Sequence, residues 1–367
     1  MKNVFLVSVA NGYGGAERSL ELIVRNAPPD VRVWVFARHP EHIAALTAGG
    51  LPANVTLIRI GDIGSLFGRR RAAFRLLQAC WRYRPESIVL NTNHSALLAA
   101  MAARWMPGIG ALCSLYVRDF QWTELDYIFS RLRGCEVLVP SDAITARPGY
   151  LVPWYVGSAA ARSFVVIPDM VEAVPGPAGD EGYFLHLATV NPWKGHVELV
   201  MAARQLAAEG RPAVIRSYGL VADHGLHERL VGWIAKLGLH RQVTLADYEP
   251  DPMDILRRCR AVLVPSVSHS GGPESFGRSI IEAWACGKPV IAYAAGAPSR
   301  LIRHGVDGLL VAEGDVAGLA GAIGQLQADA GLSDRLGAAG RARVAECFTA
   351  QRVVPELFQH LLARSAR

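Results

Sequence analysis

The sequence predicts an α/β protein built from two doubly wound parallel-sheet domains. Short apolar runs alternate with longer amphipathic stretches along the 367 residues, as strands and helices do in parallel sheets that are covered on both faces. The alternation stops at the segment IPDMVEAVPGPAGDEG, residues 167–182, and then restarts. A chain of this length exceeds one ordinary core, so two domains joined by this Pro-, Gly- and acid-rich linker are expected.

The first half of the chain holds the elements of one sheet. Apolar runs there predict strands, and the amphipathic stretches between them predict helices. The expected strands are 4–9, 31–36, 55–58, 88–90, 111–115 and 137–139, and the expected helices are 16–26, 66–83 and 95–105.

The second half repeats the pattern and ends in helices. The expected strands are 183–187, 213–218, 243–245, 261–264, 289–293 and 308–311, and the expected helices are 197–208, 224–237, 253–258, 279–286, 317–326, 332–346 and 350–362. Open α/β sheets bind ligands at the carboxyl ends of their strands. A cleft between two facing domains is therefore the expected site.

Composition and net charge indicate which classes of molecule the protein is expected to bind. Hydrophobic residues make up 51% of the chain and charged residues 19%, which excludes a disordered protein. The net charge of +6 favours anionic partners, but no zinc-finger spacing or RNA-binding signature points to nucleic acid. The six cysteines form no CxxC pair, and the first apolar run resembles a strand more than a leader. We expect a cytoplasmic protein, soluble or peripheral at the inner face of the membrane.

The strongest chemical signal is PESFGRSIIEAWACGKPVIAY, residues 273–293. Glu274 is expected in the loop before a helix that Phe276 and Gly277 open, and Glu282 inside that helix. Free amides in the first turn, residues 276–279, would form a site for a diphosphate. Two carboxylates beside it suit the hydroxyls of two sugars, a ribose and a hexose.

Two further segments follow predicted strands. Lys194, in LATVNPWKGHVELV, is placed to neutralise a diphosphate, although a lone exposed lysine would need no function. NGYGGAERSLELI resembles a dinucleotide fingerprint, but Glu17 stands where the third glycine belongs, which disfavours NAD. This glycine turn suits a sugar or a phosphate equally well.

The segment SLFGRRRAAFRLLQACWRYR, residues 65–84, is basic and apolar and contains no acid. On a helix it could lie against an anionic membrane and reach a lipid-linked acceptor, or it could be a packed helix with a solvated basic face. The sequence leaves both readings open.

Together these motifs resemble the GT-B fold, and specifically retaining glycosyltransferase family 4, the glycosyl transferases group 1. The segment ESFGRSIIE, residues 274–282, matches that family's E-x7-E motif, and the resemblance is clearest over 183–312. It implies two facing Rossmann-like domains with a cleft between them. The implied division is an acceptor domain at 1–168, a linker at 169–182, a nucleotide-sugar donor domain at 183–346, and a helix at 347–367 that returns to the first domain.

The resemblance also implies roles for single residues. It assigns Glu274 to the transferred sugar, Glu282 to the ribose, Lys194 to the diphosphate, and Tyr248 to the nucleobase. The predicted donor-binding residues are Gly14, Gly15, Asn191, Lys194, Tyr248, Glu274, Phe276, Gly277, Arg278, Ser279 and Glu282. The predicted catalytic residues are Glu274, Lys194, Arg118 and Asp119.

The chain departs from the family pattern at two positions. Thr189 stands where the family has the arginine of its diphosphate pair, so Arg278 or Arg300 would have to supply that charge. Arg118–Asp119 stands where the family has a histidine–aspartate pair, and an arginine does not shuttle protons near neutral pH. His94 is a candidate substitute.

The predicted reaction moves a hexosyl unit from a nucleoside-diphosphate sugar to the hydroxyl of a glycan, lipid-linked or small-molecule acceptor. The resemblance implies retention of configuration without a metal or a cofactor. Alternatives are a nucleotide-sugar epimerase of the same fold, a dinucleotide oxidoreductase, and a non-catalytic sugar-nucleotide-binding subunit.

Overall fold

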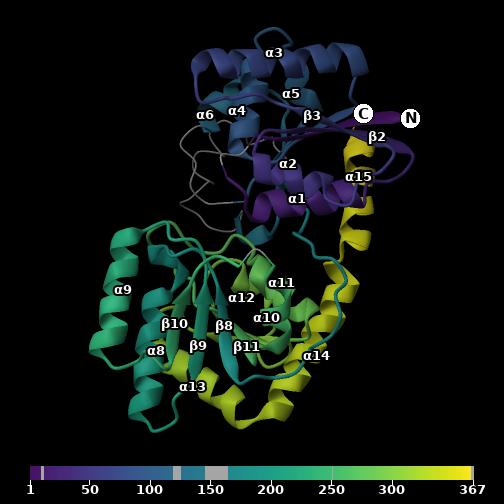
Figure 1. Ribbon diagram of the computed structural model, residues 1–367. Coiled ribbons are helices and arrows are strands. Elements are labelled where there is room, and N and C mark those ends of the chain that lie inside the picture. Colours follow the sequence, from purple (N-terminus) through teal and green to yellow (C-terminus); the bar gives the residue numbers. More distant parts are fainter. Residues whose placement is uncertain (10–11, 119–124, 145–163, 250, 365–367) are drawn as a thin grey trace. The chain divides into compact units, whose positions relative to one another are not determined.

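The chain forms two compact units in its computed structural model, which describes residues 1–9, 12–118, 125–144, 164–249 and 251–364 (Figure 1). Unit 1 comprises Met1–Met170 and Ala350–Arg367, and unit 2 comprises Val171–Thr349. The predicted linker residues from Val171 onward belong to unit 2, where the Val171 amide donates to the Phe348 carbonyl over 2.9 Å. Among the helices that the structure describes, none has the length and apolar character needed to cross a bilayer.

Unit 1 is built on a seven-stranded parallel sheet with the order β3-β2-β1-β4-β5-β6-β7. The strands are β1 (Lys2–Ser8), β2 (Val31–Ala37), β3 (Val55–Arg59), β4 (Ser87–Leu90), β5 (Cys113–Tyr116), β6 (Glu136–Val139) and β7 (Phe164–Val166). The chain moves outward from β1 to β3 and then returns to place β4 beside β1. This reversal leaves a crevice at the carboxyl ends of β1 and β4, the usual ligand position in such sheets.

Helices cover both faces of the unit 1 sheet (Figure 1). They are α1 (Gly15–Arg25), α2 (Pro40–Thr47), α3 (Leu66–Tyr83), α4 (Asn93–Ala102), α5 (Ile109–Leu112), α6 (Leu125–Arg131) and α15 (Ala350–Arg364), with a 3₁₀ turn η1 (Asp142–Ile144). One core lies under α3 and α4, and the other under α1 and α15. Helix α15 buries Val354, Leu357 and Leu361 in that second core, since residues three or four apart share one face of a helix.

Unit 2 has a six-stranded parallel sheet with the order β10-β9-β8-β11-β12-β13. Its strands are β8 (Tyr183–Leu187), β9 (Val214–Tyr218), β10 (Val243–Ala246), β11 (Ala261–Val264), β12 (Val290–Tyr293) and β13 (Gly308–Val311). Its helices are α8 (His196–Ala208), α9 (His224–Lys236), α10 (Met253–Arg258), α11 (Arg278–Ala285), α12 (Pro298–Leu301), α13 (Val316–Ala328) and α14 (Ala330–Cys347), with a 3₁₀ turn η2 (Pro192–Lys194). The same reversal occurs here between β8 and β11.

One predicted strand in unit 1 is shorter than the sequence suggested. The apolar run 111–115 divides between α5, which ends at Leu112, and β5, which begins at Cys113. Gly110 lets α5 pack closely on the Arg133 backbone, where an added Cβ would lie 2.4 Å from the Arg133 carbonyl oxygen. Helix α2 and strand β7 were not predicted, because each is a short element without a clear apolar period.

Helices α11 and α14 of unit 2 meet through glycines. A Cβ on Gly340 would lie 2.2 Å from the Trp284 ring, and one on Gly337 would lie 2.0 Å from the Gly287 carbonyl oxygen. The Trp284 indole is fully buried and donates to the Asp307 carbonyl over 2.7 Å. Because neither glycine has a side chain, α14 presses directly against the back of α11.

Candidate active site

The crevice of unit 2 brings together two of the predicted catalytic residues. Lys194 lies in the loop after β8 and Glu274 in the loop after β11, and these strands are neighbours at the reversal of the sheet. Lys194 Nζ lies 2.5 Å from Glu274 Oε1, and the Ser266 hydroxyl donates to the same oxygen over 2.9 Å. Both charged side chains keep a little exposure, 20% and 13%, so a ligand can reach the pair.

The backbone of the turn around Lys194 fixes the position of its side chain. Pro192–Lys194 form the 3₁₀ turn η2, and α8 begins at His196, one residue before the predicted range 197–208. Gly195 separates them with a left-handed φ of 82°, and a Cβ there would lie 2.1 Å from the Pro265 carbonyl oxygen. The Lys194 ammonium also sits 3.9 Å from the centre of the Trp193 ring. Glycine at 195 therefore decides where the lysine points.

The buried His186 supports this loop through hydrogen bonds, and its ring lies edge-on to that of His196. Desolvation first, then the electrostatic influence of the neighbouring His196 ring and the Lys194 ammonium, lowers the pKa of His186 well below its ordinary value. The neutral His186 ring places Nε2 at 3.1 Å from the Lys194 carbonyl and Nδ1 at 2.9 Å from the Ser217 hydroxyl. A carbonyl only accepts, so Nε2 carries the proton and Nδ1 accepts from Ser217. Sequence reasoning missed this support.

Helix α11 begins at Arg278, one residue before the predicted range 279–286, and Gly277 at φ 89° acts as its N-cap. Among the residues that the structure describes, no side chain caps this end of the helix. A Cβ on Gly277 would lie 2.8 Å from the Ile280 Cδ1 atom, so this position favours glycine. The predicted amide site over 276–279 therefore comprises the residues just before the helix and the first two residues within it.

Glu282 lies one turn into α11 and pairs with Arg278, whose Nη2 is 3.1 Å from Glu282 Oε1. Its side chain is 11% exposed. Glu274 and Glu282 are thus each neutralised by one cation, Lys194 and Arg278. Buried carboxylates need such partners, and both cations are of the kind that binds phosphate.

The loop after β12 fixes the backbone of Glu274. The Ala297 amide donates to the Glu274 carbonyl over 2.9 Å. Gly296 has φ 65°, and a Cβ there would lie 2.5 Å from that same carbonyl oxygen. The glycine of AAGAP was the sequence signal for this contact, but nothing in a single sequence linked it to Glu274.

The remaining donor-binding residues predicted in unit 2 fall at the same edge of its sheet. Asn191 precedes η2 and its carbonyl accepts from the Lys194 amide over 3.1 Å. Tyr248 follows β10, two strands away from β8, and is 39% exposed. Phe276 is buried, and Ser279 is the second residue of α11. Arg300 is exposed on the short helix α12.

In unit 1, Arg118 follows β5 and is bound from several sides. Its Nη1 donates to Asn91 Oδ1 over 2.8 Å, its Nε lies 3.5 Å from Asp169 Oδ1, and its guanidinium stacks 3.8 Å above the centre of the Tyr116 ring. Asp169 also accepts from Ser19 of α1 over 2.7 Å. Asp119, the other predicted catalytic residue of this unit, lies outside the described residues.

The glycine turn of unit 1 ends in a self-capped helix. Gly14 is the N-cap of α1, which begins at Gly15, and the Gly14 amide donates to Glu17 Oε2 over 3.1 Å. Burial raises the pKa of Glu17. Glu17, which departs from the dinucleotide fingerprint, therefore forms part of the N-terminal cap of α1.

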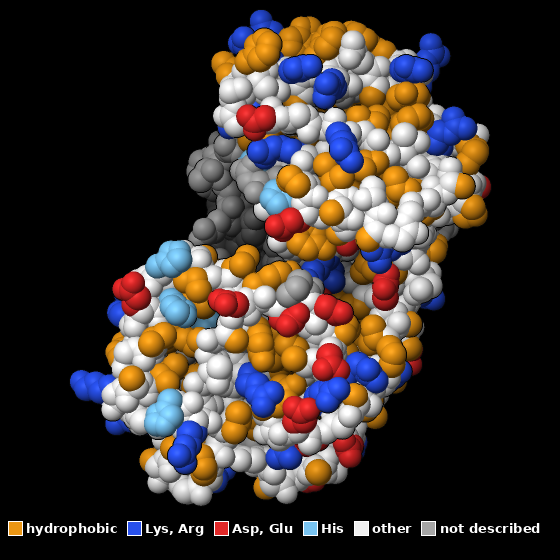
Figure 2. Space-filling model, in the orientation of Figure 1, with side chains coloured by type: hydrophobic (Ala, Val, Ile, Leu, Met, Phe, Trp, Pro, Cys, Tyr) orange, Lys and Arg blue, Asp and Glu red, His pale blue; other side chains and the backbone are white. Residues whose placement is uncertain are grey.

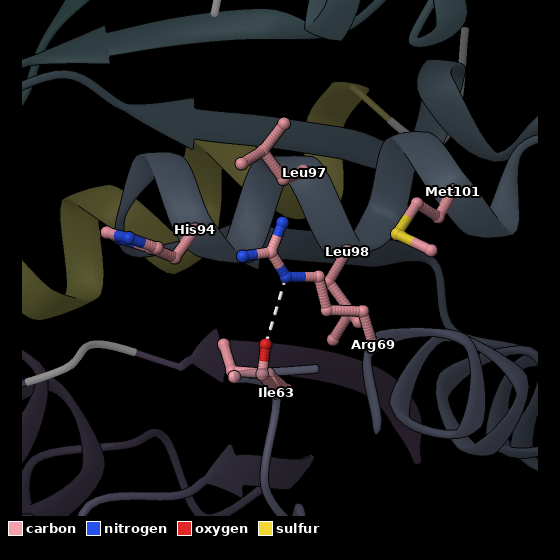
Figure 3. A pocket seen from close by; sticks show the side chains of 7 residues that line it. Ile63, Arg69, His94, Leu97, Leu98 and Met101 are labelled. Carbon is pink, nitrogen blue, oxygen red and sulfur yellow. Dashed lines mark hydrogen bonds between the residues drawn. The ribbon is translucent and has the colours of Figure 1, made fainter. Parts of the chain in front are cut away.

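His94 lines a small pocket of unit 1 with a volume of about 80 Å³ (Figure 3). It lies in the first turn of α4 and is exposed. Arg69 enters the same pocket and donates through Nε to the Ile63 carbonyl over 2.9 Å, while Leu97 and Met101 supply apolar walls. The pocket thus combines one guanidinium, one imidazole and an apolar lining.

Comparison with known proteins places this geometry in a family. Residues 171–343 match the family described as glycosyl transferases group 1. The chain is 33% identical over 168 residues to a D-inositol 3-phosphate glycosyltransferase of Nocardia farcinica, an alignment that covers 44% of this chain and 36% of that relative. It is 36% identical over 121 residues to the lipopolysaccharide core biosynthesis glycosyltransferase LpsD of Rhizobium meliloti, covering 33% of this chain and 34% of the relative. The chain therefore spans little more than a third of the length of either protein.

Solved structures show a similar fold over the whole chain. Alr3699/HepE of Anabaena, solved in complex with UDP-glucose, superposes with a TM-score of 0.79 at 21% identity, covering 99% of this chain and 100% of that one. A glycosyltransferase of Rickettsia africae superposes with a TM-score of 0.78 at 18% identity, covering 99% and 98%. The predicted class, two Rossmann-like parallel-sheet domains of the GT-B type, is confirmed. Residues 171–343, which lie within unit 2, are thus similar to the glycosyl transferases group 1 family.

Proposed function

We propose that this protein transfers a hexosyl unit from a nucleoside-diphosphate sugar to an acceptor hydroxyl, with retention of anomeric configuration. One observation carries the proposal: Lys194 and Glu274 meet at 2.5 Å in the crevice between β8 and β11, beside the uncapped start of α11. Helix starts and lysines bind phosphate, and carboxylates bind sugar hydroxyls.

The two ion pairs of the site provide a mechanism for binding. A diphosphate entering the crevice attracts Lys194 and Arg278, the present partners of Glu274 and Glu282. Each carboxylate then accepts hydrogen bonds from sugar hydroxyls, with Glu274 serving the hexose and Glu282 the ribose. Charge and hydrogen bonds are exchanged between partners, so no buried carboxylate is left unpaired.

The same groups stabilise the departing diphosphate. As the glycosidic bond breaks, negative charge grows on the phosphate oxygens and positive character grows at the anomeric carbon. Lys194, Arg278 and the first amides of α11 surround the position proposed for that negative charge, and preorganised donors of this kind lower the barrier. We assign this role to the protein's own cations and amides, with no metal and no cofactor.

Retention follows from attack on the same face as the leaving group. In the proposed step, the acceptor oxygen bonds to the anomeric carbon, the bond to the diphosphate breaks, and a phosphate oxygen takes the acceptor's proton. No protein base is needed in this scheme. It is therefore compatible with arginine at position 118, which cannot act as a base near neutral pH.

Similar solved structures suggest which donor to try first. The Anabaena protein is described in complexes with UDP and with UDP-glucose, so we propose a UDP-sugar for this chain. The named relatives act in inositol-phosphate and lipopolysaccharide-core glycosylation. For this chain, an acceptor hydroxyl on a glycan, a lipid-linked sugar or a small polar molecule fits the proposal.

A thermal-shift screen against UDP-, GDP-, ADP- and dTDP-sugars tests donor binding. We expect one nucleotide class to raise the melting temperature of the wild type, and Glu282→Ala to abolish that rise. Glu209→Ala is the matched control, because Glu209 is an exposed acid at the end of α8 in the same unit. Release of the nucleoside diphosphate with an acceptor present then separates an enzyme from a binding subunit. Unchanged binding and turnover in Glu282→Ala would refute the site.

A further inference from the structure

Helix α3 of unit 1 carries a line of three exposed aromatic side chains. Phe67, Phe74 and Trp81 are 77%, 47% and 56% exposed. They are spaced seven residues apart, which is close to two helical turns, so they lie within about 40° of one another around the helix axis. We call these three residues the aromatic ridge.

The opposite face of α3 is fully used by the core of unit 1. Ala72, Ala73, Leu76, Leu77 and Cys80 are all buried there. The helix therefore cannot turn to hide the ridge without exposing its own core face. Three large aromatic side chains in water are costly for a protein to keep, and such a patch indicates a contact surface.

Arginines flank the ridge on both sides. Going around the helix, Arg70 lies on one side of the ridge, and Arg71 and Arg82 lie on the other. No acid occurs between Asp62 and Glu86. Asp62 pairs with Arg38 at 3.2 Å, and Glu86 accepts from the Asn3 amide at 2.6 Å. Figure 2 shows hydrophobic and basic side chains gathered over this helix.

We propose that α3 lies flat on an anionic lipid bilayer, with the aromatic ridge in the interface and its arginines on the lipid phosphates. The helix has 18 residues and so extends for about 27 Å, long enough to place all three aromatic side chains at one depth. Aromatic residues with flanking cations on one helix face are the signature of an interfacial helix.

The charge pattern distinguishes this occupant from a second copy of the chain. Two α3 helices packed ridge to ridge would bring Arg70, Arg71 and Arg82 of one copy against those of the other. Like charges in contact oppose such a dimer, whereas an anionic surface neutralises every one of them. The proposal concerns a surface of unit 1 and requires no sugar nucleotide, so it stands or falls separately from the proposed function.

Co-sedimentation of the full chain with lipid vesicles tests the proposal. One set of vesicles is phosphatidylcholine alone, and in the other about a third of the lipid is phosphatidylglycerol. We expect the protein to pellet with the anionic vesicles only, and to be released by high salt. Absence of pelleting with anionic vesicles overturns the proposal.

Two sets of variants identify the surface. We expect Arg70→Gln/Arg71→Gln/Arg82→Gln to weaken anionic-vesicle binding about 100-fold, since each basic residue near the surface contributes about fivefold. A matched variant, Arg32→Gln/Arg104→Gln/Arg133→Gln, removes the same charge from exposed positions elsewhere in unit 1 and should bind nearly as the wild type does. Equal losses in both would overturn the assignment to α3.

The aromatic ridge is tested by Phe67→Ser/Phe74→Ser/Trp81→Ser. We expect at least a tenfold loss of binding with an unchanged melting temperature, because these side chains are exposed. Trp105→Ser is the control, since Trp105 is 50% exposed in the same unit. Size-exclusion chromatography detects the alternative occupant: a wild-type dimer that the ridge variant converts to a monomer would overturn the proposal in favour of self-association.

Discussion

The two units share one topology but use their crevices differently. In each, the chain runs outward over three strands and returns beside the first, between β1 and β4 in unit 1 and between β8 and β11 in unit 2. Beside the first crevice, Arg118 is bound by Asn91, Asp169 and the Tyr116 ring. In the second crevice, Lys194 has one charged partner, Glu274, and stays 20% exposed.

This difference separates a structural ion pair from an exchangeable one. Asp169 is 6% exposed and also bonds to Ser19, so the Arg118 pair ties α1 to the segments after β4 and β5. The Lys194 pair lies beside a helix start without a side-chain cap. The strand reversal that both sheets share therefore supplies a position for a site, and the residues at the loop ends decide whether it binds a ligand or holds the fold.

The largest effect is expected from Lys194→Ala in unit 2. Loss of this cation should lower kcat by about 10²–10³-fold, because a charge aimed at the leaving group acts mainly in the transition state. Lys194→Arg should recover part of the rate. Turnover of nucleotide sugar measures both, with Lys236→Ala on exposed α9 as the control. A rate for Lys194→Ala within threefold of the control would remove Lys194 from the mechanism.

Arg118→Met tests whether the ion pair between Arg118 and Asp169 stabilises the fold. We expect the free energy of unfolding to fall by about 3 kcal/mol, because Asp169 would stay buried without its cation. Lys194→Met should cost less, about 1–2 kcal/mol, since Glu274 is partly exposed and keeps the Ser266 hydroxyl as a donor. Urea unfolding followed by circular dichroism compares the two. A larger loss for Lys194→Met would reverse the distinction between the crevices.

Glycine substitutions sharpen the same comparison. Gly195→Ala should destabilise unit 2 by about 2–4 kcal/mol and abolish donor binding, because φ is 82° and the Cβ would meet the Pro265 carbonyl. Gly14→Ala in unit 1 should change stability by less than about 0.5 kcal/mol, since φ is −155° and its nearest new contact is 3.8 Å away. The melting temperatures of both variants measure these losses of stability. Equal losses in Gly195→Ala and Gly14→Ala would show that the two turns are equally constrained.

The smallest effect concerns acid stability. Burial first, then nearby charges, lower the pKa of His196 in unit 2 and of His42 in unit 1 to about 4. Each is neutral when folded, so its stabilisation is complete above the unfolded pKa of about 6.5 and is lost as pH falls toward 4.

We expect each histidine to lower the free energy of unfolding by on the order of 2 kcal/mol as pH falls to 4.5. Replacing either histidine with leucine should remove that histidine's part of the decline. Unfolding of His196→Leu and His42→Leu across this pH range measures the two shares. Acid profiles identical to that of the wild type would show that neither imidazole resists protonation in the fold.

The sequence predicted the parallel-sheet architecture because its signals are local. Apolar runs such as Ala261–Val264 and the helix Leu66–Tyr83 are visible within a short window, and the structure has both at those bounds. Elements without a strong period were missed, including α2, or were divided differently, as at α5 and β5.

The sequence predicted the candidate site less completely than it predicted the fold. Lys194 and Glu274 could be placed at strand ends, but their contact at 2.5 Å depends on which strands are neighbours. Ser266 and His186 carried no signal, because a lone serine or histidine is ordinary in any sequence. Their importance comes from packing, which brings each of them onto the loop that holds Lys194 or Glu274.

The glycine contact between α11 and α14 has a consequence for natural variation and for engineering. Gly340 leaves no room behind Trp284, so any larger residue there must displace α11 and with it Arg278 and Glu282. An inactivating mutation could therefore arise on the far side of α11 from any bound sugar. Attempts to retarget the enzyme should leave α14 unaltered and vary the loops instead.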